Sequence, residues 1–297
     1  MTHFEFSVQA QPSAAMRPPR SRLYPWYDSA WLDSYSRARQ LLRSVRPGVL
    51  DEFEEAMNVF RTRADFAVRK FQPLLDQETI EKIREVIKGL APSDFELHEA
   101  QQFRRLVVHD HPYFSALQET LVSLVSEAAG EPVEAHYNFL SLYTSSGVCP
   151  VHMDSPDAKW TLDLCVNQSE AWPIWFSQVQ PWPDVDASEP QAWTAGEWQR
   201  SIRQSAAVTF TPQSMEPGEA LLFSGSSQWH YRDAMPARNA NSSCDLLFFH
   251  FIPAGCRELV VPANWARLFD VPELVEIGAA LAPAATRANV PEQVAGV

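Results

Sequence analysis

The sequence predicts an α+β protein in which a layer of helices precedes an antiparallel β domain. Up to about residue 132, apolar residues recur mostly every three or four positions, as one face of a helix requires. From Val133 onward, short runs rich in Val, Phe, Trp and Thr alternate with clusters of Gly, Pro, Ser and Asn. With 297 residues, of which 45% are hydrophobic, the chain is long enough to bury a sizeable core.

Helices account for most of the first part of the chain. Apolar spacing within residues 29–71 predicts two helices, broken around Pro47. Asp76 is a candidate N-cap for a helix that runs to about residue 90, where a glycine and a proline mark its end. A fourth helix is expected over residues 113–129, closed by Gly130.

Seven strands are expected in the second part, from runs of β-forming residues between turn signals. These runs are residues 135–143, 149–152, 159–166, 172–176, 208–211, 219–223 and 244–252. Residues 181–205, with Trp182, Trp193 and Trp198, are interpreted as an insertion in the β domain. The predicted organisation is a flexible arm (1–22), a helical region that packs on the β domain (23–132), the β domain as catalytic core (133–283) and a tail (284–297).

Composition excludes several classes of function. A net charge of -13 disfavours nucleic acid as a partner, because such binding depends on clustered Lys and Arg. No apolar stretch is long enough to cross a bilayer, and the start of the chain lacks the apolar centre of a secretory signal. The four cysteines form no CxxC pair and are expected to be buried thiols, so we predict a cytoplasmic protein.

Two histidines and an aspartate form a candidate metal site. His152 and Asp154 are two residues apart, so in a strand both would point to the same face. The pair alone is weak evidence, but a turn and a buried strand lead to a second histidine, His230. Two histidines and one carboxylate leave coordination positions open, as in ferrous oxygenases, whereas a structural zinc site would use four protein ligands.

These motifs stand in a series of blocks that resembles the iron(II)- and 2-oxoglutarate-dependent dioxygenases, in particular their prolyl-4-hydroxylase-like branch. The resemblance covers residues 135–253, about 40% of the chain. The blocks are Leu142-Tyr143, Gly147 and His152-Met153-Asp154; Trp160 to Asn167; Pro217-Gly218 with Leu221-Leu222-Phe223; and the last run, from Cys244 to Ile252.

The resemblance implies a double-stranded β-helix, which is a cupin-like jelly-roll barrel, with supporting helices on one side. It implies Fe(II), 2-oxoglutarate and O2 as cofactors, with His152, Asp154 and His230 as metal ligands and catalytic residues. The implied reaction is decarboxylation of 2-oxoglutarate to succinate with oxidation of a substrate carbon, by default a hydroxylation. An intact Asp154 argues against the related halogenases, which have a small residue at that position.

A basic residue is expected to bind the distal carboxylate of 2-oxoglutarate, since a guanidinium can do so with two hydrogen bonds. Relatives place it nine or ten positions after the distal histidine, where this chain has no basic residue. Arg238 is the first candidate and Arg232 the second, and each could equally be a solvated arginine. Tyr143 and Thr161 are further candidates for the co-substrate site, with core packing as the alternative for Tyr143.

Candidate substrate-binding residues follow from the same blocks. The resemblance turns Asp163 inward with Thr161, where a buried carboxylate needs a partner such as the co-substrate arginine or a substrate amino group. If the register were shifted by one residue, Asp163 would be solvated. Trp160 and Trp229 lie next to the metal motifs and are expected to wall the pocket, although core packing explains them almost as well.

Four other histidines are interpreted as surface residues or as structural residues. His109 and His111 flank Asp110 in an expected loop before a helix and are taken as surface residues. His136 and His250 lie in predicted strands and are expected to be hydrogen-bonded structural histidines.

The leading hypothesis is an oxygenase acting on a small molecule, such as an amino acid or a specialised metabolite, with a peptide as a further option. One alternative is a cupin-like hydrolase or isomerase that holds zinc or manganese on the same three ligands. Another is a non-catalytic barrel, which the displaced basic residue keeps open. The helices before residue 135 and the insertion are candidate contacts for a homodimer.

Overall fold

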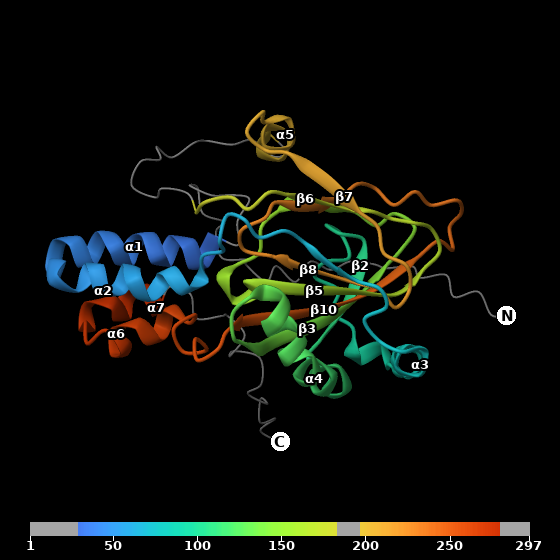
Figure 1. Ribbon diagram of the computed structural model, residues 1–297, viewed down its shortest axis with the longest axis horizontal. Helices are drawn as coiled ribbons and strands as arrows, with labels where there is room; N and C mark the ends of the chain where they lie inside the picture. Colours follow the sequence, from blue (N-terminus) through green and yellow to red (C-terminus); the bar gives the residue numbers. More distant parts are fainter. Residues whose placement is uncertain (1–28, 183–196, 280–297) are drawn as a thin grey trace, which may run out of the picture.

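Two antiparallel sheets with helices packed around them make up the computed structural model, which describes residues 29–182 and 197–279 (Figure 1). The strands are β1 Arg69–Phe71, β2 Arg105–His109, β3 Val133–Tyr143, β4 Cys149–His152, β5 Trp160–Gln168, β6 Ile174–Ser177, β7 Phe210–Gln213, β8 Ala220–Ser224, β9 His230–Arg232 and β10 Cys244–Pro253. The helices are α1 Ser29–Val45, α2 Pro47–Met57, α3 Gln77–Lys88, α4 Pro112–Ala129, α5 Glu197–Gln204, α6 Trp265–Leu268 and α7 Val275–Ala279.

The chain passes repeatedly from one sheet to the other. The large sheet has the strand order β1-β8-β5-β10-β3-β2, and the small sheet has the order β4-β9-β6-β7. From β3 to β10, only β6 and β7 follow one another within the same sheet. Apolar residues of both sheets share one buried cluster, which includes Phe176 of the small sheet and Phe223 and Phe248 of the large sheet. The two sheets therefore pack face to face, and residues alternate along each strand between this interior and the outside.

Helices α3 and α4 cover the outer face of the large sheet (Figure 1). In α3, Ile80 and Ile83 are buried, and in α4, Leu121 and Val125 are buried, as the helical spacing of apolar residues requires. They pack with every second residue of the central strands, for example Leu162 of β5. This arrangement leaves the other face of the same strands for the interior between the sheets.

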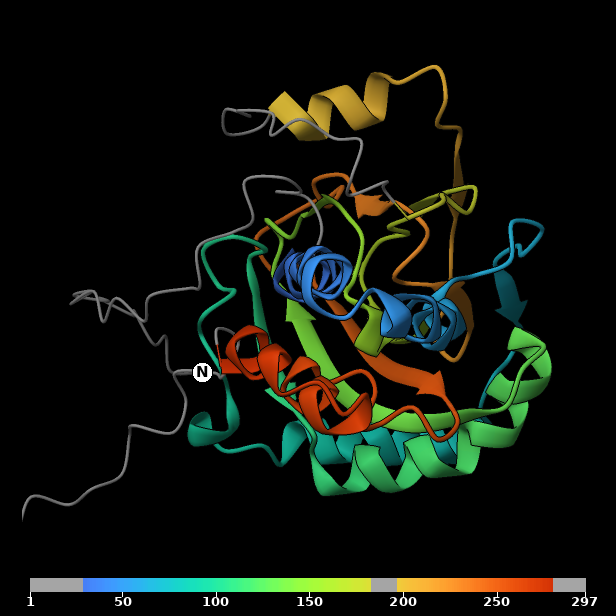
Figure 2. The same ribbon diagram turned by 90° about the vertical axis from the view of Figure 1, so that its left-hand side faces the viewer.

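A second helical layer joins segments from the two halves of the chain. Helices α1 and α2 lie beside α6 and α7 (Figure 2) and share one apolar cluster with them. The Trp31 indole packs edge-on against Trp265, with ring centroids 5.6 Å apart, and its Nε1 donates to the Val260 carbonyl at 2.8 Å. The cluster also includes Val151 and Trp229, so these helices pack against the outside of the small sheet.

The helices and strands expected from the sequence are present. Helix α1 ends at Val45 and α2 begins at Pro47, which confirms the break at that proline. Asp76 caps α3 by accepting a hydrogen bond from the Thr79 amide at 2.7 Å, and Gly130 ends α4 with a left-handed φ of 76°. Each of the seven expected strands is found, with every end within two residues of its expected position.

Several expectations have a different or a partial outcome. The strands β1 and β2 lie in the region expected to be helical, and α5, α6 and α7 were not predicted. The arm over residues 1–22, the tail over residues 284–297 and part of the expected insertion, residues 183–196, lie outside the described residues. Within the described ranges, no helix has the length and apolar character needed to cross a bilayer. The four cysteines are buried and unbridged, as predicted.

Candidate metal centre

The structure brings His152, Asp154 and His230 together. His152 is the last residue of β4 and pairs directly with His230, the first residue of β9, so both imidazoles leave the small sheet on the same face. Their Nε2 atoms lie 3.5 Å and 3.7 Å from Oδ1 of Asp154, respectively. One ligand atom from each of the three residues falls within 4.8 Å of the others. Among the described residues, this is the one such group of His, Cys, Asp and Glu.

Backbone carbonyls orient both imidazoles. Nδ1 of His152 lies 2.8 Å from the Pro150 carbonyl, and Nδ1 of His230 lies 3.0 Å from the Gln228 carbonyl. A carbonyl only accepts hydrogen bonds, so each Nδ1 carries the proton and donates it. Each Nε2 therefore faces Asp154, and once it is unprotonated its lone pair can bind a metal ion beside the carboxylate.

The aspartate is held by one group from strand β5 and one from the turn after β8. Its amide donates to the Gly225 carbonyl at 2.9 Å, and the Thr161 hydroxyl donates to Oδ2 at 3.3 Å. Burial alone would raise the pKa of Asp154, but the imidazoles of His230 and His152 outweigh it and hold this pKa well below its usual range. The carboxylate therefore stays ionised and available as a ligand.

Gly225 is a part of this site that the sequence did not reveal. A Cβ atom at this position would lie 2.5 Å from the Ala158 carbonyl and 2.7 Å from the Thr161 hydroxyl, and it would also clash with the Asp154 carboxylate. Glycine is thus required where the turn after β8 approaches the Asp154 carboxylate. The signal in the sequence is only a glycine among serines, which by itself indicates any turn.

The centre is open on one side. The side chains of His152 and Asp154 are 28% and 21% exposed, whereas that of His230 is 6% exposed. His230 packs against Phe223, with ring centroids 4.9 Å apart. Three protein ligands with free access from the side of His152 and Asp154 fit a catalytic ion better than a closed structural one.

Arg232 and Asp163 form a buried ion pair close to the metal centre. Arg232 lies two residues after His230 on β9, so its side chain also points into the interior. Its Nη2 donates to Oδ2 of Asp163 at 2.8 Å, and its Nη1 donates to the Trp172 carbonyl. The side chains of Arg232 and Asp163 are 4% and 0% exposed. Asp163 is therefore inward, and the alternative of a shifted register with a solvated Asp163 is excluded.

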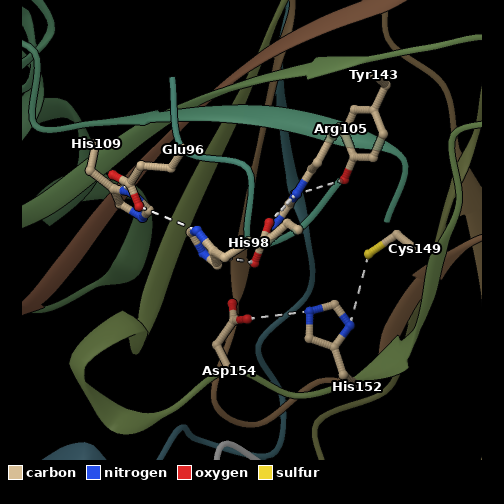
Figure 3. Close-up of polar contacts among 9 residues, drawn as sticks. Glu96, His98, Arg105, His109, Tyr143, Cys149, His152 and Asp154 are labelled. Carbon is tan, nitrogen blue, oxygen red and sulfur yellow. Dashed lines mark hydrogen bonds and ion pairs between the residues drawn. The ribbon is translucent and has the colours of Figure 1, made fainter. Parts of the chain in front are cut away.

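A second buried arginine, Arg105, lies beside Tyr143 (Figure 3). Its Nη1 donates to the Tyr143 hydroxyl at 2.7 Å, and its Nε donates to a carboxylate oxygen of Glu99. Arg105 is on β2 and pairs with Tyr143 across the strands, so it also faces the interior. We call Arg105, Tyr143, Asp163 and Arg232 the arginine cluster. Sequence reasoning missed Arg105 because β2 lies in the part of the chain that was expected to be helical.

The other predicted site residues lie elsewhere. The Arg238 side chain is 81% exposed and pairs with Glu170, so it does not belong to the buried cluster. Trp160 and Trp229 adjoin inward residues of their strands and therefore face outward. Trp160 packs on Phe66 in the apolar cluster that includes α3 and α4, and Trp229 lies in the cluster of α1 and α2. Neither tryptophan lines the interior between the sheets.

The remaining histidines depart in part from expectation. His109 ends strand β2 rather than lying in a loop and contacts Glu96 at 2.8 Å, while His111 caps α4 by accepting from the Tyr113 amide. His136 and His250 lie in or beside the core, but the Nδ1 atom of each is buried without a partner among the described residues, contrary to the expected hydrogen bonds. Burial lowers the pKa of His250 to about 3.

Comparisons with known proteins bear on the fold. No family model and no curated protein matches this sequence. Among solved structures, the carbocyclase SnoK from nogalamycin biosynthesis, a non-haem alpha ketoglutarate dependent enzyme, is 12% identical, with a TM-score of 0.50 over 68% of this chain and 84% of that chain. AviO1 from Streptomyces viridochromogenes Tue57 is 16% identical over 68% of this chain and 95% of its own (TM-score 0.46). A Pseudomonas putida prolyl-4-hydroxylase is 10% identical over 68% and 99% (TM-score 0.43).

At these identities the likeness concerns the fold alone. The chain shares the fold of SnoK, an alpha ketoglutarate dependent enzyme, so the resemblance noted in the sequence is confirmed at the level of the fold. The convergence of the three candidate ligands within that fold is established by their own geometry.

Proposed function

We propose that the protein is an Fe(II)- and 2-oxoglutarate-dependent oxygenase. The observation that carries this proposal is the triad of His152, Asp154 and His230, whose Nε2 and carboxylate atoms converge on one point with open access from one side. Two imidazoles and one carboxylate are the donor set associated with non-haem ferrous oxygenases. When bound, iron, 2-oxoglutarate and O2 together supply an oxidant for a substrate carbon, and succinate and CO2 are the products of the co-substrate.

We further infer that the two sheets form a double-stranded β-helix, the cupin-like jelly roll. The order of the strands supports this inference, because the chain alternates between the sheets from β3 to β6 and again from β7 to β10. In such a barrel the sheets enclose a site in the interior. The triad and the arginine cluster both face that space.

Arg232 is the residue that we propose to bind the distal carboxylate of 2-oxoglutarate. It is two residues from His230 on the same face of β9, which corresponds to about 6.8 Å along a strand. At this spacing Arg232 would hold the distal carboxylate of a 2-oxoglutarate molecule bound at the triad. Thr161 and Tyr143 are proposed as further contacts of the co-substrate, and Arg105 adds a second positive charge beside Tyr143. Arg238 is not proposed, because it is exposed and paired with Glu170.

We propose a small molecule as substrate, such as an amino acid or a specialised metabolite, with hydroxylation as the default outcome. The exposure of His152 and Asp154 on one side of the centre supports access for such a molecule. The net charge of -13 argues against a polyanionic partner. Four unbridged cysteines support a reducing compartment, for which we propose the cytoplasm.

The decisive experiment is anaerobic reconstitution with Fe(II) and 2-oxoglutarate. We expect a visible absorption band from the complex of metal and co-substrate, and succinate once oxygen is admitted. Absence of both would contradict the proposal. Activity that persists under nitrogen with zinc or manganese would instead favour a cupin-like hydrolase or isomerase. Iron binding without any turnover would favour a non-catalytic barrel.

The ligand assignment is tested by His152→Ala and His230→Ala. Each variant is expected to lose iron binding while its far-ultraviolet circular dichroism stays unchanged, because backbone pairing, in which the ligand side chains take no part, joins β4 to β9. His111→Ala, at the start of α4, is the matched control and should bind iron as the unmodified protein does. Full iron occupancy in either ligand variant would refute the assignment.

A further inference from the structure

Asp163 has an unusual environment for a carboxylate. It is fully buried, and only one of its oxygens is satisfied: Oδ2 accepts from Arg232 at 2.8 Å, while Oδ1 has no hydrogen-bond partner among the described residues. Its register partners on the flanking strands are Phe248 and Leu221, which offer no hydrogen bond. A buried oxygen without a partner costs about 1–3 kcal/mol, so it indicates a place for a missing donor or acceptor.

The charged groups that face Asp163 are few. Arg232 and His230 face it from β9, and Arg105 faces it from β2. Burial raises the pKa of Asp163, and Arg232 opposes this effect. Cys165, two residues further along the same face, stays a neutral thiol because the neighbouring Cys244 and burial raise its pKa. No hydrogen bond or ion pair joins Asp163 to His152, Asp154 or His230, and Thr161, which donates to Asp154, precedes Asp163 on the same face of β5.

The position of Asp163 conflicts with simple binding of a dicarboxylate. The following inference rests on the proposed function, in which Arg232 receives the distal carboxylate of 2-oxoglutarate. That carboxylate and Asp163 would then share one guanidinium in a space closed to water. Two ionised carboxylates side by side repel each other strongly, and such pairs bind one proton between them.

We propose that 2-oxoglutarate binds together with one proton, which Asp163 takes up from solvent. The unpartnered Oδ1 of Asp163 becomes the donor of an O–H···O hydrogen bond to the distal carboxylate. Arg232 then carries the charge of the co-substrate instead of that of Asp163. In the absence of the co-substrate, Asp163 keeps the buried guanidinium neutralised.

The sign of the pH dependence follows from this exchange. A group that gains a proton on binding has a higher pKa in the complex than in the free protein, so the ligand binds more weakly as the pH rises between these two pKa values. For one proton the dissociation constant rises by up to about tenfold per pH unit in that window. A pocket with a fixed, unpaired arginine would show no such dependence.

The experiment measures co-substrate binding and proton uptake directly. The protein is saturated with Fe(II) without oxygen, and 2-oxoglutarate is titrated from about pH 6 to about pH 8.5, with the visible band as the signal. Calorimetric titration at one pH, in buffers with different ionisation enthalpies, counts the protons taken up. We expect affinity to fall as pH rises and a count near one. A band with no proton uptake at any pH would overturn the inference alone, whereas absence of a band at every pH would overturn the proposed function as well.

The variant Asp163→Asn provides a second test, because its carboxamide can donate a hydrogen bond to the distal carboxylate at any pH. We expect this variant to bind 2-oxoglutarate without proton uptake and with a dissociation constant that is flat over the same range. The matched control is Asp245→Asn. Asp245 lies on the face of β10 that points away from the interior, and burial also raises its pKa. It should keep the pH dependence of the unmodified protein. A pH dependence that survives in Asp163→Asn would contradict the assignment of the proton uptake to Asp163. If this variant does not fold, the proton count on the unmodified protein decides.

Discussion

At the scale of single residues, the two ligand histidines are oriented in the same way. Each donates from Nδ1 to the carbonyl of the residue two positions before it, Pro150 for His152 and Gln228 for His230. The orientation of each ring is thus determined by the backbone of its own segment. No neighbouring side chain is needed to select the tautomer, so substitutions around the centre should leave the Nε2 atoms facing the metal position.

Gly225 gives a residue-scale prediction. Gly225→Ala places a methyl group against the Asp154 carboxylate and the Thr161 hydroxyl. We expect the variant to bind iron at least tenfold more weakly and to lose about 1–3 kcal/mol of unfolding free energy, since a packed site cannot absorb the extra volume. Metal titration and chemical denaturation measure the two effects.

The control for this substitution is Gly48→Ala in α2, where the new Cβ would meet no atom within 4 Å. It should leave iron binding unchanged and preserve or increase stability, because alanine is favoured over glycine in helices by about 1 kcal/mol. Equal iron affinity in both variants would show that Gly225 has no role in placing Asp154.

The sequence predicted that His152, Asp154 and His230 come together, but it predicted only part of their surroundings. His152 and Asp154 were found because strand periodicity relates residues that are close in sequence, and His230 because a strand leads to it. Arg105 and Gly225 act through contacts between distant strands, which no local pattern reveals. The alternation of side chains along a strand also explains why Trp160 does not wall the site. Trp160 adjoins Thr161, and adjacent residues in a strand face opposite ways.

At the scale of elements, α4 is anchored to the large sheet by a buried amide. Gln118 donates to the carbonyls of His250 at 2.7 Å and Tyr137 at 3.0 Å, and its own carbonyl accepts from Asn138. The register between β3 and β10 shifts beside these residues, next to Phe251. Gln118 thus satisfies backbone groups that the irregular pairing leaves exposed to an apolar interface.

Gln118→Leu should therefore destabilise the protein although leucine is apolar and favours helices. We expect a loss of about 2–3 kcal/mol in unfolding free energy, because two buried carbonyls lose their donor. Glu119→Leu, the next residue and exposed, is the control and should change stability by less than about 0.5 kcal/mol. Denaturant titration of both variants decides; equal stabilities would mean that the amide does not anchor the helix.

The elements that the sequence did not predict are short or lack a period. β1, with the sequence Arg-Lys-Phe, shows no alternation, and it exists because it pairs with β8 at the edge of the large sheet. Helices α6 and α7 have four and five residues and are held by packing on α1 and α2. Such segments are defined by tertiary contacts, so propensity and periodicity carry little information about them.

At the scale of the whole molecule, one buried imidazole makes stability depend on pH. His250 has a pKa of about 3 in the folded protein, against an ordinary value of 6.5, because burial disfavours its charged form. The unfolded chain therefore binds more protons as pH falls below about 6.5, and folding stability falls with pH until about 3.

His250→Phe should flatten this dependence, by up to about 1.4 kcal/mol per pH unit between pH 6 and pH 4, measured on the metal-free protein by denaturant titration. Phenylalanine preserves the stacking that His250 makes with Tyr137, whose ring centroid lies 4.1 Å away. His98→Phe, at a half-exposed histidine, is the control and should keep the original slope. Identical slopes in all three proteins would contradict a neutral, buried His250.

The hydrogen bond between Trp31 and Val260 joins residues 229 positions apart. On a ribosome that adds about 5–20 residues per second, α1 and α2 would wait roughly 10–45 s for α6 and α7 to be made. During that time their apolar faces have no native partner. The nascent protein is thus expected to depend on chaperones that shield such faces, and slower translation of its middle segment should increase aggregation even though no finished contact is altered.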